Sequence, residues 1–271
     1  EIENKLATTS GTCPVMGTAS TMAILSEVLG IMPINSATAP AIHADRLRIA
    51  EKTGEIAATK ILQKKIIAKN YINKKSFENA LRVLFAISGS TNALIHLTAM
   101  ARRLNIKIDL KKINKISDET PVLVNLKPVG TGYMEDFHNA GGLDSVLKEL
   151  KNSLNLECKN LEGISLKDRI KKLNNKQTNR SYIFSREKPI NKKGGLIILF
   201  GSLAPDGAIL KRAAATTKLL EHEGKAIVFS SLKDLSKRID NPNLKVSEKN
   251  ILILKNAGPS SDAGMPEAGY L

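Results

Sequence analysis

Apolar residues recur at helical spacing along the first two thirds of the chain. From Thr18 to Gly30, the side chains of Met22, Leu25 and Leu29 share one face, with Thr18 as the expected N-cap and Gly30 as the expected end. The same spacing predicts helices over residues 45–69, 76–88 and 90–105, and a turn from residue 134 that leads into a helix after Gly142.

The segment 90–105 has the clearest amphipathic pattern. Ser90 is its expected N-cap, and Leu94, Leu97 and Ala101 form its inner face. Further on, the apolar run 121–126 is typical of a short buried strand.

The pattern changes after a polar, charged stretch between about residues 163 and 193, which is the best candidate for a domain boundary. Beyond it, two extended runs flank a predicted turn at residues 204–207, in which Pro205 presets φ and Gly207 completes the turn.

The remaining apolar runs are short and of strand length. Residues 225–231 and 250–259 are predicted strands, with a short helix near residues 232–240 between them. The sequence therefore predicts an α/β protein, with a partial α/β domain over residues 1–175 and then a linker and part of a mainly β domain over residues 176–271.

Length and composition fit a globular protein of two ordinary domains. The chain has 271 residues, and no apolar run approaches the roughly 20 residues that a membrane span needs. The first residues show no signal-peptide pattern. Cys13 and Cys158 are the only cysteines, which argues against a disulfide framework and favours a reducing, cytoplasmic location.

The net charge of +15 raises the question of a nucleic-acid partner. Aromatic residues make up only 4% of the chain, tryptophan is absent, and the lysines are scattered rather than gathered in a stripe. A solvated, lysine-rich surface therefore explains the charge better than a nucleic-acid footprint, and we expect neither a nucleic acid nor a membrane as a partner. A non-catalytic basic binding protein stays open as an alternative.

Cys13 has the most suggestive setting of the candidate residues. Small residues surround it, and the helix expected from Thr18 begins a few positions later. The positive end of a helix dipole stabilises a thiolate, which suits a nucleophile or a ligand of an iron–sulfur cluster. A structural cysteine fits the local pattern equally well.

The other candidate groups have weaker settings. No two histidines lie at i, i+3 or i, i+4, so we expect no zinc site from them; they are His43, His96, His138 and His222. We expect His96 to be a satisfied buried histidine and Cys158 to be a packing residue. Glu267, in a final segment rich in glycine, offers the oxygen donor that Mg²⁺ prefers, although composition alone favours a solvated surface acid.

Five motifs follow one another along nearly the whole chain. They are "GTCPVMGTASTM", "SGSTNALIHLTAMAR", "PVLVNLKPVGTGYMEDFHNAGGL", "GGLIILFGSLAPDGAILK" and "ILKNAGPSSDAGMPEAGYL". Together they resemble the dihydroxy-acid dehydratase and sugar-acid dehydratase family of iron–sulfur hydro-lyases. The stretch "MGTASTM" and the ending "NAGP…GMPEAGYL" resemble the aldonate branch, whose members dehydrate L-arabinonate, D-xylonate and similar acids.

The resemblance implies roles for particular residues. Cys13 matches the last of three cysteines that hold a [2Fe–2S] cluster, and Glu267 matches a carboxylate ligand of Mg²⁺. Weaker candidates, for contacts to the substrate or to the groups around it, are Thr18, Ser20, Ser90, Thr91, Asn92 and Glu135.

The implied reaction converts a sugar acid to a 2-keto-3-deoxy acid. An open iron site acts as a Lewis acid on the departing C3 hydroxyl. Mg²⁺ stabilises the developing enolate, and a deprotonated serine removes the C2 proton. A dihydroxy-acid dehydratase of branched-chain amino-acid synthesis is the alternative within the family.

The resemblance also implies an incomplete catalytic set. The other two cysteines are expected before Glu1 and the serine base beyond Leu271, so we expect an internal segment that is inactive alone. A small-molecule acid, a barrel-like second domain and a homo-oligomer (dimer or tetramer) are the further expectations.

Overall fold

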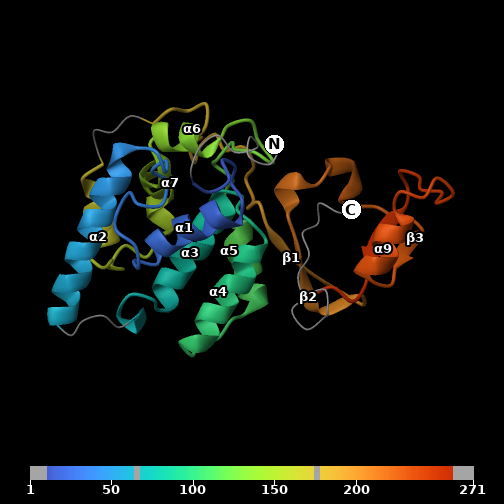
Figure 1. The fold of residues 1–271 in the computed structure, drawn as a ribbon, viewed down its shortest axis with the longest axis horizontal. Coiled ribbons are helices and arrows are strands. Elements are labelled where there is room, and N and C mark those ends of the chain that lie inside the picture. The colour runs from blue at the N-terminus through green and yellow to red at the C-terminus, as the bar shows by residue number, and fades with distance from the viewer. Residues whose placement is uncertain (1–10, 64–67, 174–177, 259–271) are drawn as a thin grey trace, which may run out of the picture. The chain divides into compact units, whose positions relative to one another are not determined.

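The computed structural model describes residues 11–63, 68–173 and 178–258, and the chain forms two compact units (Figure 1). Unit 1 is Glu1–Ala214 and unit 2 is Ala215–Leu271. Within the described residues, no helix has both the length and the apolar character needed to cross a membrane. The predicted α/β class is confirmed, whereas the predicted domain division at residues 175 and 176 stays a prediction.

Unit 1 is mainly helical and ends in a β-hairpin. Its described elements are α1 (Thr18–Val28), α2 (Ala44–Leu62), η2 (Ala68–Asn70), α3 (Lys74–Ala86), α4 (Asn92–Arg103), α5 (Leu110–Asp118), α6 (Met134–Asn139), α7 (Gly142–Leu150), η3 (Lys151–Ser153), α8 (Leu166–Lys171), β1 (Ile197–Gly201), β2 (Ala204–Leu210) and η4 (Arg212–Ala214). The predicted helices are all present, and α6 replaces the turn expected from residue 134.

Helix α3 lies at the centre of the apolar core of unit 1. Its residues Phe77, Val83, Leu84 and Phe85 are almost fully buried, and the helix packs against α1, α5 and α7. The predicted inner face of α4 is confirmed, because Leu94, Leu97 and Ala101 are all buried. Burial of these faces provides the main stabilisation of the unit.

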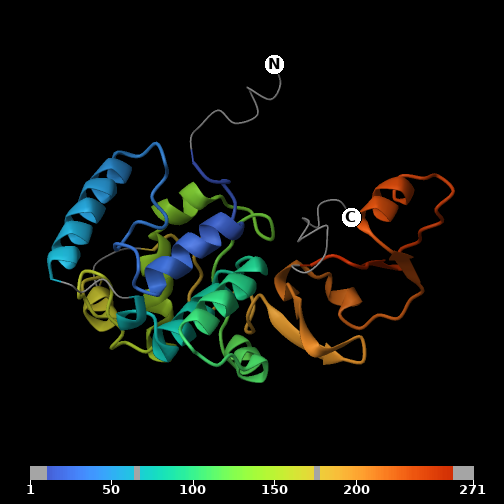
Figure 2. The same cartoon turned by 60° about the horizontal axis from the view of Figure 1, so that its bottom comes forward.

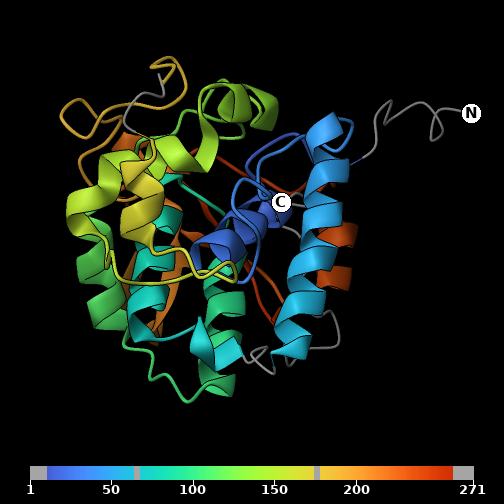
Figure 3. The same ribbon diagram turned by 90° about the vertical axis from the view of Figure 1, so that its left-hand side faces the viewer.

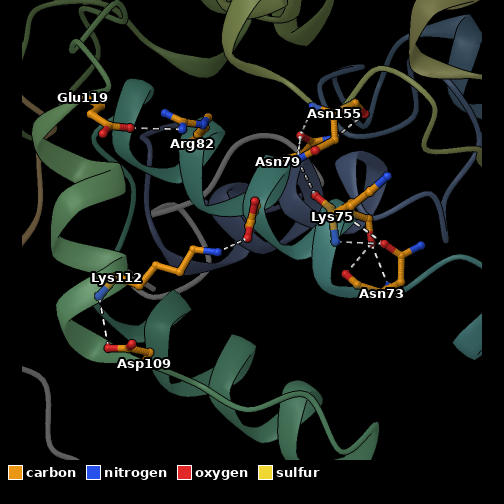
Figure 4. Close-up of polar contacts among 10 residues, drawn as sticks. Asn73, Lys75, Asn79, Arg82, Asp109, Lys112, Glu119 and Asn155 are labelled. Atoms are coloured by element: carbon orange, nitrogen blue, oxygen red, sulfur yellow. Dashed lines mark hydrogen bonds and ion pairs between the residues drawn. The ribbon is translucent and has the colours of Figure 1, made fainter.

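The polar side of α3 is fastened to its surroundings (Figure 4). Asn73 caps the helix by accepting from the N–H groups of Lys75 and Ser76, and Asn79 pairs with the backbone of Asn155. Lys112 of α5 binds Glu78 of α3. The central helix is thus held in place on its polar side as well as on its apolar one.

Helix α1 has no side-chain cap at its N-terminus. The N-cap is Gly17 and not Thr18, so the predicted cap is wrong by one residue. The hydroxyl of Thr18 is used elsewhere, in contacts with Ser90 and Asn92. Gly30 follows the helix at φ +85°, and a Cβ there would stand 2.7 Å from the carbonyl oxygen of Lys159, so the predicted stop is confirmed.

Helix α2 lies at the periphery of unit 1 (Figure 3). Its bounds are shorter than the predicted 45–69, and Leu47 is 78% exposed. The helical spacing of its apolar residues is therefore real, but the face they form is turned to solvent.

The run 121–126 is buried as predicted but does not form a strand of a sheet. Val122, Leu123 and Val124 are at most 4% exposed. The segment is extended and makes only isolated bridges, such as Val122 with Asn191 and Val124 with Ile183. Its N–H and C=O groups find partners in separate loops, so no continuous ladder is built.

The hairpin turn of unit 1 lies at Ser202 and Leu203 and not at residues 204–207, as predicted. Gly201 pairs with Ala204, and Leu199 pairs with Ala208. Two additional residues of β2 therefore bulge between these pairs. Pro205 and Gly207 fall within this bulge and not within a turn. Pro205 lacks an N–H to donate to the partner strand, and Gly207 adopts φ +103°.

A buried ion cluster joins α1, α7 and α8. Arg169 donates to Glu27 Oε1 at 2.5 Å and to Asp144 Oδ1 at 2.8 Å, and all three side chains are at most 8% exposed. Glu27 also accepts from the N–H groups of Asn35 and Ala37. Burial opposes the charge of Arg169, but the two carboxylates outweigh it and raise the pKa of its guanidinium.

Unit 2 contains η5 (Thr217–Leu219), β3 (Ala226–Phe229), α9 (Leu232–Arg238) and β4 (Ile251–Leu254). The two strands pair in parallel, and the segment that contains α9 provides the crossover connection that parallel strands need. The predicted strands and short helix are confirmed. The barrel-like form expected for this part stays a prediction, because the described residues of the unit form a two-stranded sheet.

Candidate functional site

Cys13 lies on a short, well-fastened loop before the first turn of α1. The thiol is free and exposed. Around it, Pro14 O accepts from Met134 N at 2.8 Å and Met16 N donates to Lys127 O at 2.9 Å. The loop is therefore fixed to the segment 127–134, and its thiol is available to a ligand.

The hydroxyls at the start of α1 contact the start of α4, and Figure 2 shows the two helices side by side. Thr18 Oγ1 lies 2.8 Å from Ser90 Oγ and accepts from Asn92 Nδ2 at 3.0 Å. Ser90 Oγ accepts from Asn92 N at 3.2 Å. Three of the predicted site residues thus form one partly buried cluster, which we call the polar cluster (Thr18, Ser90 and Asn92).

A third hydroxyl, that of Thr21, supports the polar cluster. Thr21, fully buried, accepts from Ser90 N at 3.1 Å. Gly89 permits this contact, because a Cβ there would stand 2.7 Å from Thr21 Cγ2. Sequence reasoning missed Thr21, although its position one helical turn after Thr18 could have indicated it.

The other predicted site residues are not part of the polar cluster. Ser20 is buried and donates to Val15 O at 2.9 Å, so it shapes the Cys13 loop. Thr91 is half-buried at the N-cap of α4, and Glu135 is exposed in the first turn of α6. Glu267 lies outside the described residues.

A lysine–tyrosine pair beside the Cys13 loop was not predicted. Lys127 Nζ donates to Tyr133 Oη at 2.5 Å and lies 4.2 Å from the centre of the Tyr133 ring. The Cys13 loop accepts from Met134, next to this tyrosine. A cation therefore stands close to the loop that carries the thiol.

Two expectations on isolated residues had different outcomes. His96 is exposed on α4, so the expected buried histidine is wrong. Its position just outside the apolar face is enough to turn it to solvent. Cys158 is half-buried in a small cavity that Leu147 and Leu166 also line, in agreement with a packing role.

The two thiols should differ in reactivity. Burial raises the pKa of the Cys158 thiol, whereas Cys13 is exposed. We expect iodoacetamide to modify Cys13 at least about tenfold faster in the metal-free protein, because burial shields a sulfur and lowers its thiolate population. Peptide mass spectrometry of a time course measures both rates, and equal rates would contradict the described environments.

The fit of this region to an iron–sulfur cluster can be judged from the donor set. An exposed thiol on a fixed loop at an uncapped helix N-terminus suits one ligand of an anionic cluster. Within residues 11–63, 68–173 and 178–258, no second cysteine joins Cys13 in a ligand group. The described residues therefore fit one ligand of a cluster and leave the other ligands to be supplied from elsewhere.

The two halves of the chain match two models of one protein family. The N-terminal model of the dihydroxy-acid/6-phosphogluconate dehydratases matches residues 1–169, and the C-terminal model matches residues 181–271. The chain therefore belongs to the dihydroxy-acid/6-phosphogluconate dehydratase family. The family expected from the five motifs is confirmed.

Individual relatives agree with this assignment. The chain is 35% identical over 269 residues to a dihydroxy-acid dehydratase of Methanococcoides burtonii, covering 98% of this chain and 48% of the relative. A dihydroxy-acid dehydratase of Caldanaerobacter subterraneus is 36% identical over 268 residues, 98% of this chain and 47% of the relative. The chain thus spans about half the length of the curated relatives it matches. Their names correspond to the alternative within the family and not to its sugar-acid branch.

Proposed function

We propose that the protein is a hydro-lyase that removes water from a 2,3-dihydroxy carboxylic acid. Family membership supports the reaction type. The observation that carries the proposal is the free, exposed Cys13 thiol on the loop that leads into α1, whose first residue, Thr18, belongs to the polar cluster. That arrangement combines a soft metal ligand with donors and acceptors for a hydroxylated acid.

Two donor side chains indicate which metal groups the protein would bind. Cys13 would be one thiolate ligand of a [2Fe–2S] cluster, and Glu267 one carboxylate ligand of Mg²⁺. Bound there, the two groups supply Lewis-acid polarisation of the leaving hydroxyl and of the substrate carboxylate.

The chain's own residues hold the substrate and balance charge. The uncapped N–H groups of α1 and the dipole of this helix favour negative charge, which both a carboxylate and a thiolate carry. Thr18 and Ser90 can each donate or accept through a hydroxyl, and Asn92 can do both through its amide. A diol has the same mixed character, so the polar cluster suits a substrate with adjacent hydroxyls.

Of the two substrate classes, the relatives favour the branched dihydroxy acids. The relatives from Methanococcoides burtonii and Caldanaerobacter subterraneus are both named dihydroxy-acid dehydratase. A sugar acid contains the same 2,3-dihydroxy carboxylate, so the predicted aldonate activity is the competing proposal.

A direct assay decides between these substrates. The gene's full product, purified anaerobically and supplied with iron, sulfide and Mg²⁺, is offered 2,3-dihydroxyisovalerate, L-arabinonate and D-xylonate in parallel. We expect 2-keto acid to form fastest from 2,3-dihydroxyisovalerate. Faster turnover of a pentonate would support the sugar-acid branch, and no turnover of any of the three would overturn the proposal.

Removing one hydroxyl of the polar cluster should weaken substrate handling. We expect Ser90→Ala to lower kcat/KM by about 10- to 100-fold, because one hydrogen bond to a charged or developing group is worth about 1.5–3 kcal/mol. Ser181→Ala, which removes an exposed serine hydroxyl, is the matched control. Equal kcat/KM for Ser90→Ala and Ser181→Ala would show that the polar cluster does not contribute to substrate handling.

A further inference from the structure

A second group of potential metal ligands lies apart from the Cys13 thiol. His43 precedes α2, Asp45 is in the first turn of α2, and His138 is on α6. One ligand atom of each residue lies within 4.8 Å of the others. In the part of the chain that the structure describes, this is the one group of three or more such side chains that meets this limit.

The three side chains are close to the spacing that a metal ion requires. His43 Nδ1 lies 3.3 Å from Asp45 Oδ2. The ring centroids of His43 and His138 are 5.8 Å apart, and the ring planes are inclined at 66° to each other. Ligand atoms around a tetrahedral zinc ion stand roughly 3.3 Å apart, given zinc–ligand bonds of about 2.0–2.1 Å. Small side-chain rotations would therefore bring the set to the coordination distance.

Thr38 orients the imidazole of His138. Its hydroxyl lies 3.1 Å from His138 Nδ1, and Thr38 is itself only 8% exposed. A contact on one ring nitrogen fixes the ring and leaves the other nitrogen, Nε2, for a metal, which is the usual arrangement of a metal-bound histidine. Burial, followed by the nearby His43, lowers the pKa of His138, and only the neutral ring can ligate.

The group is open to solvent on one side. Asp45 and His138 line a surface hollow of about 480 Å³, together with Thr38 and Arg48. Arg48 holds Asp45 through Oδ1 at 2.6 Å, so Oδ2 is the carboxylate oxygen directed at His43. Access is sufficient for a hydrated ion, and the carboxylate is already oriented.

We propose that His43, Asp45 and His138 form a binding site for a divalent transition-metal ion of the Zn²⁺ type. Two imidazoles and one carboxylate select such an ion over Mg²⁺ or Ca²⁺, which prefer oxygen donors. Three protein ligands leave a fourth position for water. The site does not depend on the thiolate of Cys13 or on the proposed dehydratase activity.

Zinc affinity measured without the cluster tests this site. The gene's full product carries Cys13→Ser, is freed of tag and metal, and is titrated with Zn²⁺ against a chromophoric chelator. We expect this parent protein to bind one more zinc ion per chain than the same protein with His43→Ala added. His43→Ala and His138→Ala should each weaken binding by more than about tenfold, and Thr38→Val by about 10- to 100-fold.

The controls separate ligation from folding and from adventitious binding. His96→Ala removes an exposed imidazole from α4 and should leave the affinity unchanged. Asp45→Asn keeps the shape of the carboxylate and should weaken binding. Circular dichroism confirms that each variant is folded. The proposal is overturned if the parent binds no zinc, or if His43→Ala and His138→Ala both bind it as tightly as His96→Ala does.

Discussion

Replacing Arg169 with alanine is expected to lower the free energy of unfolding by about 3–5 kcal/mol. The change leaves the carboxylates of Glu27 and Asp144 buried without the guanidinium that both of them contact. Removing one member of a buried ion group costs far more than breaking an exposed pair, because the remaining charge stays out of water. Urea denaturation, followed by circular dichroism, measures the difference.

Arg180→Ala is the matched control for this prediction. Arg180 pairs with Glu149 at 2.8 Å, but its side chain is 51% exposed. Glu149 is 11% exposed, but it also accepts from Arg186 N at 3.0 Å, so it keeps a partner when the half-exposed Arg180 is lost, and this variant should lose far less stability than Arg169→Ala. A loss of less than about 1 kcal/mol in Arg169→Ala would mean that the buried ion cluster does not hold α1, α7 and α8 together.

Cys13→Ser is expected to abolish the visible absorption of an iron–sulfur cluster and to lower dehydratase activity by at least about 10³-fold. Serine keeps the shape of the side chain but replaces the soft thiolate that iron–sulfur clusters require. Lewis-acid assistance is worth several kcal/mol, and each 1.36 kcal/mol is tenfold in rate. Absorption spectra and keto-acid formation by the gene's full product, reconstituted anaerobically, provide the two measurements.

Cys158→Ser is the control for Cys13→Ser. Cys158 is half-buried away from any described ligand group and carries a thiol whose pKa is raised by burial. This variant should keep the absorption and the activity. If Cys13→Ser retained the cluster spectrum, Cys13 would be a structural cysteine, as the local sequence pattern allows.

Much of the helical framework could be predicted because it depends on local periodicity. The buried face of α4 follows from the spacing of Leu94, Leu97 and Ala101, and the end of α1 follows from Gly30. The order of strands and helix in unit 2 is equally local. The family could be predicted as well, because its motifs are contiguous in sequence.

Two of the errors arose where a residue's partner lies far away in the chain, and a third, at Pro205 and Gly207, arose within one hairpin. Thr18 has the local sequence setting of a helix cap, but its hydroxyl contacts Ser90, 72 residues later. The run 121–126 has the composition of a strand, yet its partners lie in separate loops. Pro205 and Gly207 are typical of a turn, but in the folded hairpin they form a bulge.

The candidate sites divide in the same way. The position of Cys13 ahead of a helix N-terminus is evident from the sequence, because both features belong to one short segment. The contacts among Thr18, Ser90 and Asn92, and the group formed by His43, Asp45 and His138, become visible in the folded chain alone. Sequence spacing could not show these groups, because their members come from elements that packing of the apolar core brings together.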